Sequence, residues 1–183
     1  LLSFGILGTV WAASKASSAV ITTLNQAYGV EESRSFIRSK AIAVMLTLMM
    51  VLAIMTSLLL PVLGDLIRRL IAIFVDIPAL YSLIWNPVRW SLSSCIMLTA
   101  LICTYLLAPN LKLRIRDVVP GALFATLCWQ LASLGFSHYL SNFANYSATY
   151  GSLGTLIALM VWFYLTGLIL IVGGELNAIV KEA

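Results

Sequence analysis

The chain has 183 residues, of which 61% are hydrophobic and only 10% are charged. About a quarter of the residues of a soluble domain are charged, so this composition excludes a water-soluble globule. Eleven basic and seven acidic residues give a net charge of +4, which is too sparse for a nucleic-acid-binding surface. The composition predicts a single membrane domain over residues 1–183 and no nucleic-acid partner.

Long uncharged runs predict a polytopic, all-α transmembrane helix bundle. A spanning helix needs about 20 apolar residues, because its backbone amides must be satisfied within the segment. Such runs place five spans at about residues 1–28, 41–61, 90–109, 119–140 and 152–176, with the polar stretch 141–152 as the turn between the last two. Since the chain starts at Leu1 inside an apolar run, we expect a longer intact protein with a sixth span upstream.

The segment 64–86, between the second and third expected spans, is apolar at helical spacing. Leu66 and Leu70 repeat on one side, whereas Arg68 and Arg69 lie on the other. This pattern predicts an amphipathic helix along the outer membrane interface. The alternative is a short extra span, which the paired arginines disfavour.

Basic residues are distributed unequally between alternate loops. Seven lie in the first loop, the third loop and the C-terminal tail, whereas three lie in the second loop and none in the fourth. Lys and Arg side chains are retained in the cytoplasm, so the first and third loops and the C-terminus are expected inside.

No residue pattern indicates a catalytic centre, a metal site or a cofactor. Three cysteines lie in apolar runs without ligand spacing, and His138 is the sole histidine. The seven acidic residues are scattered along the chain, whereas a nuclease needs clustered metal ligands. We therefore expect the protein not to be an enzyme.

Three stretches resemble the YihY/virulence factor BrkB family of bacterial inner-membrane proteins. They are residues 11–36, residues 120–140 and, most specifically, 150–178 (YGSLGTLIALMVWFYLTGLILIVGGELNA). The resemblance implies six spans in a bacterial inner membrane, in agreement with the distribution of charges. It implies no catalytic residue, because the family has no established activity and its old ribonuclease BN label is regarded as mistaken. Roles in envelope integrity and export have been proposed for the family.

A polar cluster is expected near the middle of the membrane. Lys15 is the only ionisable side chain deep in an expected span, and counting at about 1.5 Å per residue puts residues of the fourth and fifth spans at a similar depth. The cluster is either a packed polar patch or a site for an anionic solute. Its predicted members are Trp11, Lys15, Ser18, Trp129, Gln130 and Trp162.

A second polar group is expected at the inner membrane surface. Glu175 is the only acid in the last hydrophobic run, and we expect it to form an ion pair with Arg34 or Arg38. The alternative is a gate or a proton acceptor at the cytoplasmic mouth. The predicted inner-mouth site consists of Asn25, Arg34, Arg38, Glu175 and Asn177.

A glycine-rich turn opens the last expected span. Tyr150, Gly151 and Gly154 permit a tight turn with free amides at a helix N-terminus, where an anion would be received. A plain turn with a helix cap is the alternative.

Two functional classes fit these features. The first is a transporter or exporter of an anionic or amphipathic solute, lipids included, in which the midplane cluster contacts the solute. The second is a non-transporting membrane scaffold or envelope-assembly factor, in which the same cluster is structural. The partners are the lipid bilayer and, for a transporter, an anionic lipid or solute, and the oligomeric state is left open.

The charge distribution makes a testable prediction of topology. A single cysteine at position 145, in a chain lacking the native cysteines, is expected to react with a membrane-impermeant reagent on intact cells, because the fourth loop faces outside. Reaction only after the cells are opened would refute this orientation.

Overall fold

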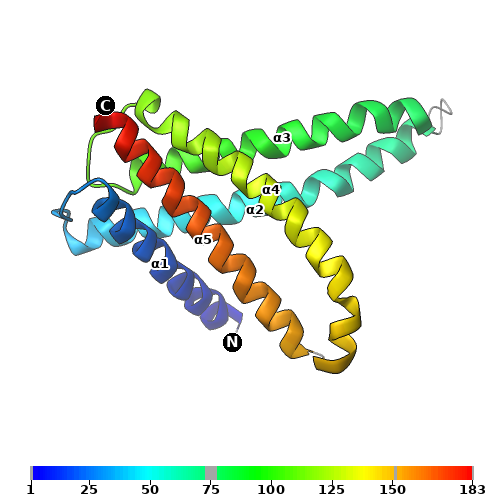
Figure 1. The fold of residues 1–183 in the computed structure, drawn as a ribbon, viewed down its shortest axis with the longest axis horizontal. Helices are drawn as coiled ribbons and strands as arrows, with labels where there is room; N and C mark the ends of the chain where they lie inside the picture. Colours follow the sequence, from blue (N-terminus) through cyan, green and yellow to red (C-terminus); the bar gives the residue numbers. More distant parts are fainter. Residues whose placement is uncertain (1, 73–77, 151, 183) are drawn as a thin grey trace. The chain divides into compact units, whose positions relative to one another are not determined.

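The computed structural model describes the backbone of residues 2–72, 78–150 and 152–182, and most of their side chains. All regular secondary structure within these ranges is helical, so the predicted all-α architecture is confirmed. Figure 1 traces the five helices along the chain. They are α1 (Leu2–Ala27), α2 (Phe36–Ala72), α3 (Pro78–Leu107), α4 (Ile115–Tyr150) and α5 (Ser152–Glu182).

Four helical stretches in the described part of the chain are long and apolar enough to cross a membrane. They correspond to the second, third, fourth and fifth expected spans. The helix α1 has 26 residues, which is long enough for the first expected span, but it is not among the four, so that span stays a prediction. The four stretches are Phe36–Ala53, Leu83–Leu107, Ile115–Leu140 and Gly154–Lys181.

Within the segment 64–86, residues 64–72 belong to α2 and residues 78–86 belong to α3, whereas residues 73–77 lie outside the described part, so the expected interfacial helix stays a prediction. The helix α2 continues to Ala72 and α3 begins at Pro78, which divides the segment between them (Figure 1). Apolar residues four apart fit the end of a long helix as well as an interfacial helix. A proline is tolerated at the first position of a helix, because its missing N–H has no partner there. The indole of Trp85 in α3 lies where a Cβ of Gly64 in α2 would be, so the two helices pack closely.

The expected turn over 141–152 is also shorter than predicted. The backbone of α4 stays helical to Tyr150, and α5 begins at Ser152. The side chains of residues 141–153 and the residue between the helices lie outside the described part. Polar residues favour loops, but they do not end a helix whose backbone hydrogen bonds continue.

The chain divides into two compact units. Unit 1 comprises residues 1–19 and 34–104, and therefore the first part of α1 together with α2 and most of α3. Unit 2 comprises residues 20–33 and 105–183, and therefore the end of α1 together with α4 and α5.

In unit 1, hydroxyl groups join α1 to α2. The Ser17 and Thr47 hydroxyl oxygens lie 2.8 Å apart, and Thr47 also donates to the Ala43 carbonyl at 2.8 Å. Thr47 is only 6% exposed, so these bonds satisfy a buried polar side chain.

In unit 2, glycines bring α4 and α5 into near-backbone contact. A Cβ at Gly121 of α4 would collide with the carbonyl oxygen of Gly173 in α5. A Cβ at Gly173 would in turn meet the Tyr105 hydroxyl and lie 2.9 Å from the Ala125 Cβ. Small residues at such crossings allow the dispersion contacts and short hydrogen bonds that hold membrane helices together.

This contact makes a prediction about stability. Gly173→Ala forces a methyl group into a filled space, so it should lower the free energy of unfolding by about 1–3 kcal/mol. Thermal unfolding of the purified protein in detergent measures the change. Gly167→Ala is the matched control, because a Cβ there meets nothing within 4 Å. Equal effects of the two substitutions would contradict the proposed role of the glycine contact.

Candidate functional site

Aromatic side chains of α4 and α5 pack together in unit 2. The ring centroids of Trp129 and Trp162 lie 5.7 Å apart at an interplanar angle of 60°. Phe136 lies 4.9 Å from Trp162 and 6.0 Å from Tyr139, so the aromatic cluster continues along α4. The structure thus brings together two members of the predicted midplane site.

Two buried groups in and next to this cluster have no hydrogen-bond partner among the residues that the structure describes. They are the Nε1 atom of Trp129 and the hydroxyl oxygen of Thr166, which lies one helical turn after Trp162. Both residues lie within two positions of the middle of their span stretches, Ile115–Leu140 and Gly154–Lys181. A buried donor without an acceptor costs about 1–3 kcal/mol, so such groups call for a partner that binds there.

Two members of the predicted midplane site, Trp11 and Ser18, contact Lys40 in unit 1. From the sequence alone, Lys40 is only a charge in the first loop. The Lys40 ammonium donates to the Ser18 hydroxyl at 3.1 Å and lies 5.7 Å from the centroid of the Trp11 ring. Lys15 is exposed and has no hydrogen bond or ion pair to the described residues. Its convergence with Gln130 and Trp162, which belong to unit 2, stays a prediction.

Asn177 of the predicted inner-mouth site is fully buried and holds the backbone of α4. Its Oδ1 atom accepts a hydrogen bond from the Gly121 N–H at 2.6 Å. This bond fixes the orientation of the amide, because the opposite orientation would set two donors against each other. The Nδ2 atom is buried, and no described residue forms a hydrogen bond with it. Asn177 therefore joins α4 to α5 through its Oδ1 atom, and its Nδ2 atom is available to donate a hydrogen bond to a bound molecule.

Asn25 joins the end of α1 to the connection between α3 and α4. Its Oδ1 atom accepts the backbone N–H of Asn110 at 2.7 Å, and its Nδ2 atom donates to Glu32 at 3.0 Å. Asn110 in turn donates from Nδ2 to the Ser33 hydroxyl at 2.7 Å. Gly29, with a φ of 60°, ends the helix in a Schellman motif, whose signature bond runs from the Val30 N–H to the Asn25 carbonyl at 2.9 Å.

The remaining members of the predicted sites are less defined. Glu175 is exposed, and no ion pair joins it to the part of the chain that the structure describes. Arg34 and Arg38 belong to unit 1, whereas Glu175 belongs to unit 2, so their pairing stays a prediction. Gly154 is buried in the first turn of α5, whereas Gly151 and the Tyr150 side chain lie outside the described residues.

Tyr28 contributes a further buried donor in unit 2. Its hydroxyl has no hydrogen-bond partner in the described part of the chain, and the Lys181 ammonium lies 6.0 Å from its ring centroid. Burial, with a smaller contribution from the charge of Asp117, raises the pKa of Tyr28 from 10.0 to about 12. The hydroxyl thus stays protonated at physiological pH and remains able to donate.

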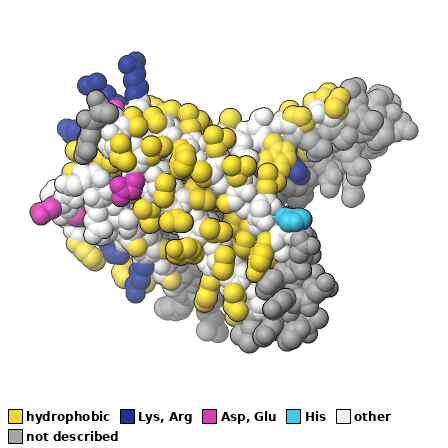
Figure 2. Space-filling view, viewed as in Figure 1, with side chains coloured by type: hydrophobic (Ala, Val, Ile, Leu, Met, Phe, Trp, Pro, Cys, Tyr) yellow, Lys and Arg dark blue, Asp and Glu magenta, His cyan; other side chains and the backbone are white. Residues whose placement is uncertain are grey.

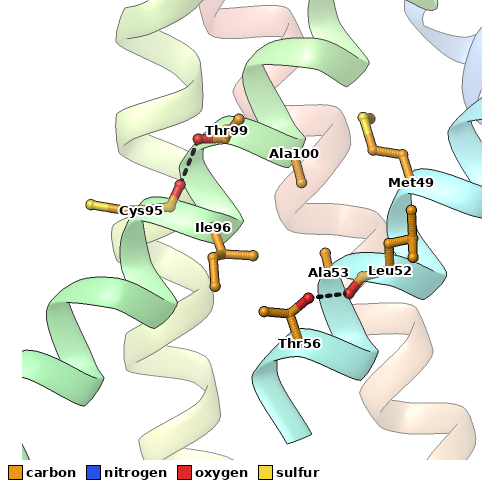
Figure 3. A pocket seen from close by; sticks show the side chains of 8 residues that line it. All are labelled: Met49, Leu52, Ala53, Thr56, Cys95, Ile96, Thr99 and Ala100. Atoms are coloured by element: carbon orange, nitrogen blue, oxygen red, sulfur yellow. Dashed lines mark hydrogen bonds between the residues drawn. The ribbon is translucent and has the colours of Figure 1, made fainter. Parts of the chain in front are cut away.

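A groove between α2 and α3 in unit 1 has a volume of about 330 Å³ (Figure 3). Thr56 and Thr99 line it, but their hydroxyls donate to the Leu52 and Cys95 carbonyls of their own helices at 2.8 Å. The groove is therefore apolar in character. Its lining consists of Met49, Leu52, Ala53, Thr56, Cys95, Ile96, Thr99 and Ala100.

The exposed surface of α5 is mostly apolar in the described part of the helix, with Glu175 as an exposed exception. On the face drawn in Figure 2, hydrophobic side chains cover this helix, and basic side chains gather near its C-terminal end. Among the described residues, no group of three or more His, Cys, Asp or Glu side chains is placed to hold a metal ion. The exposed apolar residues of α5 include Leu156, Ile157, Met160, Phe163, Tyr164 and Ile179.

Sequence comparison gives relatives in several bacteria. A Bacillus subtilis (strain 168) protein named ribonuclease-like protein YfkH is 49% identical over 182 residues, which is 100% of this chain and 66% of that protein. A UPF0761 membrane protein of Pseudoalteromonas translucida (strain TAC 125) is 36% identical over 86 residues, 47% of this chain and 29% of the relative. One from Aeromonas salmonicida (strain A449) is 41% identical over 78 residues, 43% and 27% of the two chains.

The chain thus spans just under two thirds of the length of the Bacillus relative. No solved structure gives a significant match. The family profile described as virulence factor BrkB matches residues 1–183, the whole chain. The chain therefore belongs to the virulence factor BrkB family of integral membrane proteins.

Proposed function

We propose that the protein is a transporter or exporter of the bacterial cytoplasmic membrane that moves an anionic or amphipathic solute, lipids included, and that it is not an enzyme. The observation that carries this proposal is the set of buried polar atoms in unit 2 that have no hydrogen-bond partner among the described residues. They belong to Tyr28, Trp129, Thr166 and Asn177.

These four atoms share one chemical property, because each can donate a hydrogen bond. The indole of Trp129 and the amide nitrogen of Asn177 can only donate, and the two hydroxyls can donate as well. A solute rich in acceptors, such as carboxylate, phosphate or ester oxygens, complements them. Hydrogen bonds to a charged acceptor contribute about 1.5–3 kcal/mol, more than bonds between neutral groups.

The donors lie at two levels along α5. Thr166 and Asn177 are eleven residues apart on this helix, which corresponds to about 16 Å at about 1.5 Å per residue. Donors at two depths favour a path along which a solute would contact first one group and then the other, and they disfavour a single closed polar patch. The Trp129–Trp162 cluster at the deeper level supplies an apolar surface for the hydrocarbon part of an amphipathic solute.

The membrane scaffold remains the second candidate, and the close packing of unit 2 favours it. The Tyr105 hydroxyl donates to the Leu170 carbonyl at 2.7 Å, and Asn177 holds Gly121 at 2.6 Å. Together with the glycine contacts, these bonds tie α3, α4 and α5 together within about two turns of α5. A rigid helix packing of this kind is expected for a scaffold that holds other proteins in place.

The orientation belongs to the same proposal. The distribution of basic residues places the C-terminus and the first and third loops in the cytoplasm. In this orientation Asn177 and Tyr28 lie toward the cytoplasmic side, and Trp129 and Thr166 lie near the membrane middle.

Transport by purified protein tests the proposal. Proteoliposomes receive a fluorescent phosphatidylglycerol or a soluble organic anion, and the initial rate of transbilayer movement is measured. Trp129→Phe and Thr166→Val each remove one donor, so each should lower the rate about tenfold, the equivalent of about 1.4 kcal/mol. Thr166→Val should keep or increase the thermal stability, because a buried unsatisfied group is replaced by one of similar size. Trp129→Phe also removes packed ring atoms, so it should lower the thermal stability slightly without unfolding the protein.

Tyr164→Phe is the matched control, since this ring is 71% exposed on the outer side of α5 and should leave the rate unchanged. If the unaltered protein moves neither the lipid nor the anion, the transport proposal is refuted in favour of the scaffold. Unchanged rates in both donor variants would exclude these two groups from the solute path.

A further inference from the structure

We propose that Lys40, held by Ser18 and flanked by Trp11 and Phe36, binds the phosphate group of an anionic phospholipid near the beginning of α2. This site lies within unit 1 and does not depend on the proposed transport function. It would hold a structural or regulatory lipid.

The geometry of the Lys40 side chain is the first observation. Its ammonium donates to the Ser18 hydroxyl at 3.1 Å, and that hydroxyl in turn donates to the Ser14 carbonyl at 2.8 Å. Because the hydroxyl proton is engaged, Ser18 can act only as the acceptor for Lys40. The ammonium lies 5.7 Å from the Trp11 ring centroid and 5.9 Å from that of Phe36, within cation–π range of both. The cation is therefore held in one place.

The unused binding capacity of Lys40 is the second observation. An ammonium has three N–H donors, and within the described residues Lys40 uses one of them for a hydrogen bond. No ion pair joins Lys40 to a described acid, although its side chain is half-buried. A half-buried cation without a counter-ion attracts an anion more strongly than a fully hydrated one. The arrangement therefore favours an oxyanion that accepts the remaining donors.

The surroundings decide between a lipid phosphate and a free phosphate ion. Trp11 is 60%, Phe36 73% and Ile37 80% exposed, so large apolar surfaces surround the cation. The apolar stretch of α2 that is long enough to cross a membrane begins at Phe36, and the span expected from the sequence begins at residue 41, so Lys40 lies near the end of the expected span. A long lysine side chain near the end of a span extends toward the headgroup level. A phosphate that carries acyl chains matches both the cation and the apolar rings.

A lysine that only marks topology would behave differently. It would keep its charge in water and would be replaceable by any nearby base. Arg38 provides this comparison within the chain, because it lies half a turn away on α2 and is exposed. The two residues differ in their neighbours, since the ring and hydroxyl contacts surround Lys40.

Lipid retention tests the site. The protein is extracted from vesicles of equal parts phosphatidylglycerol and phosphatidylcholine, and native mass spectrometry counts the bound lipids. The unaltered protein should retain phosphatidylglycerol preferentially. Lys40→Met should lower this retention about tenfold. Lys40→Arg keeps the charge, so it should retain more phosphatidylglycerol than Lys40→Met. Arg38→Met should leave the retention unchanged. Ser18→Ala keeps the charge but frees the ammonium, so it should lower retention severalfold.

The outcomes that overturn the proposal are distinct. Retention by Lys40→Met equal to that of the unaltered protein would overturn it, as would an equal loss in Arg38→Met. Displacement of the lipid by inorganic phosphate at millimolar concentration would assign the site to the free ion and refute the lipid. Thermal unfolding in detergent shows whether Lys40→Met is folded. If it is not, lipid retention by Ser18→Ala is the test, and retention equal to that of the unaltered protein refutes the site.

Discussion

The hydrocarbon core of a bilayer offers no hydrogen bonds, and this constraint governs both the backbone and the polar side chains of the protein. It requires helices, because only a helix satisfies its amides within one segment. It also explains why the hydroxyls of Thr56, Thr99, Thr104 and Thr126 donate to the carbonyl four residues earlier, at 2.7–2.8 Å. Against this background, a buried donor without a partner stands out, and unit 2 contains several.

The α4–α5 contact depends on three neighbouring residues of different kinds. Pro120 lies inside α4 and lacks an N–H, so the turn around it has one donor fewer for hydrogen bonds within the helix. Gly121 lets the helices approach, and Asn177 accepts the Gly121 N–H at 2.6 Å. A larger residue at Gly121 would separate the helices and remove the bond with it. Packing and hydrogen bonding at this level are therefore one interaction.

Much of the fold could be predicted from the sequence, because uncharged runs directly reflect what hydrocarbon tolerates. Helix ends were harder, since the polar residues before Tyr150 and the charges in 64–86 are compatible with continued helix. The adjacency of Trp129 and Trp162 follows from counting residues along two antiparallel spans.

Other contacts could not be predicted. Lys40 was counted as a loop charge, because a count does not show that its side chain reaches Ser18. The sequence places Asn177 among the charged residues of the inner-mouth site. Its partner is the backbone N–H of Gly121 in another helix, and a pattern of side chains cannot predict a bond to a backbone group. Thr166 had one usable signal, its position one turn after Trp162, but its lack of a partner depends on how α4 packs.

The length of α2 has a consequence for how the protein meets its membrane. Its 37 residues make a helix of about 55 Å, whereas the hydrocarbon core is about 30 Å thick. The point where the chain leaves the hydrocarbon is therefore set by the bilayer and not by the end of the helix. Each turn of α2 spans about 5.4 Å, so lipids with shorter chains would uncover roughly another turn and change which residues water reaches. A change in membrane thickness would therefore change which part of α2 lies in the hydrocarbon, with no change in the helix itself.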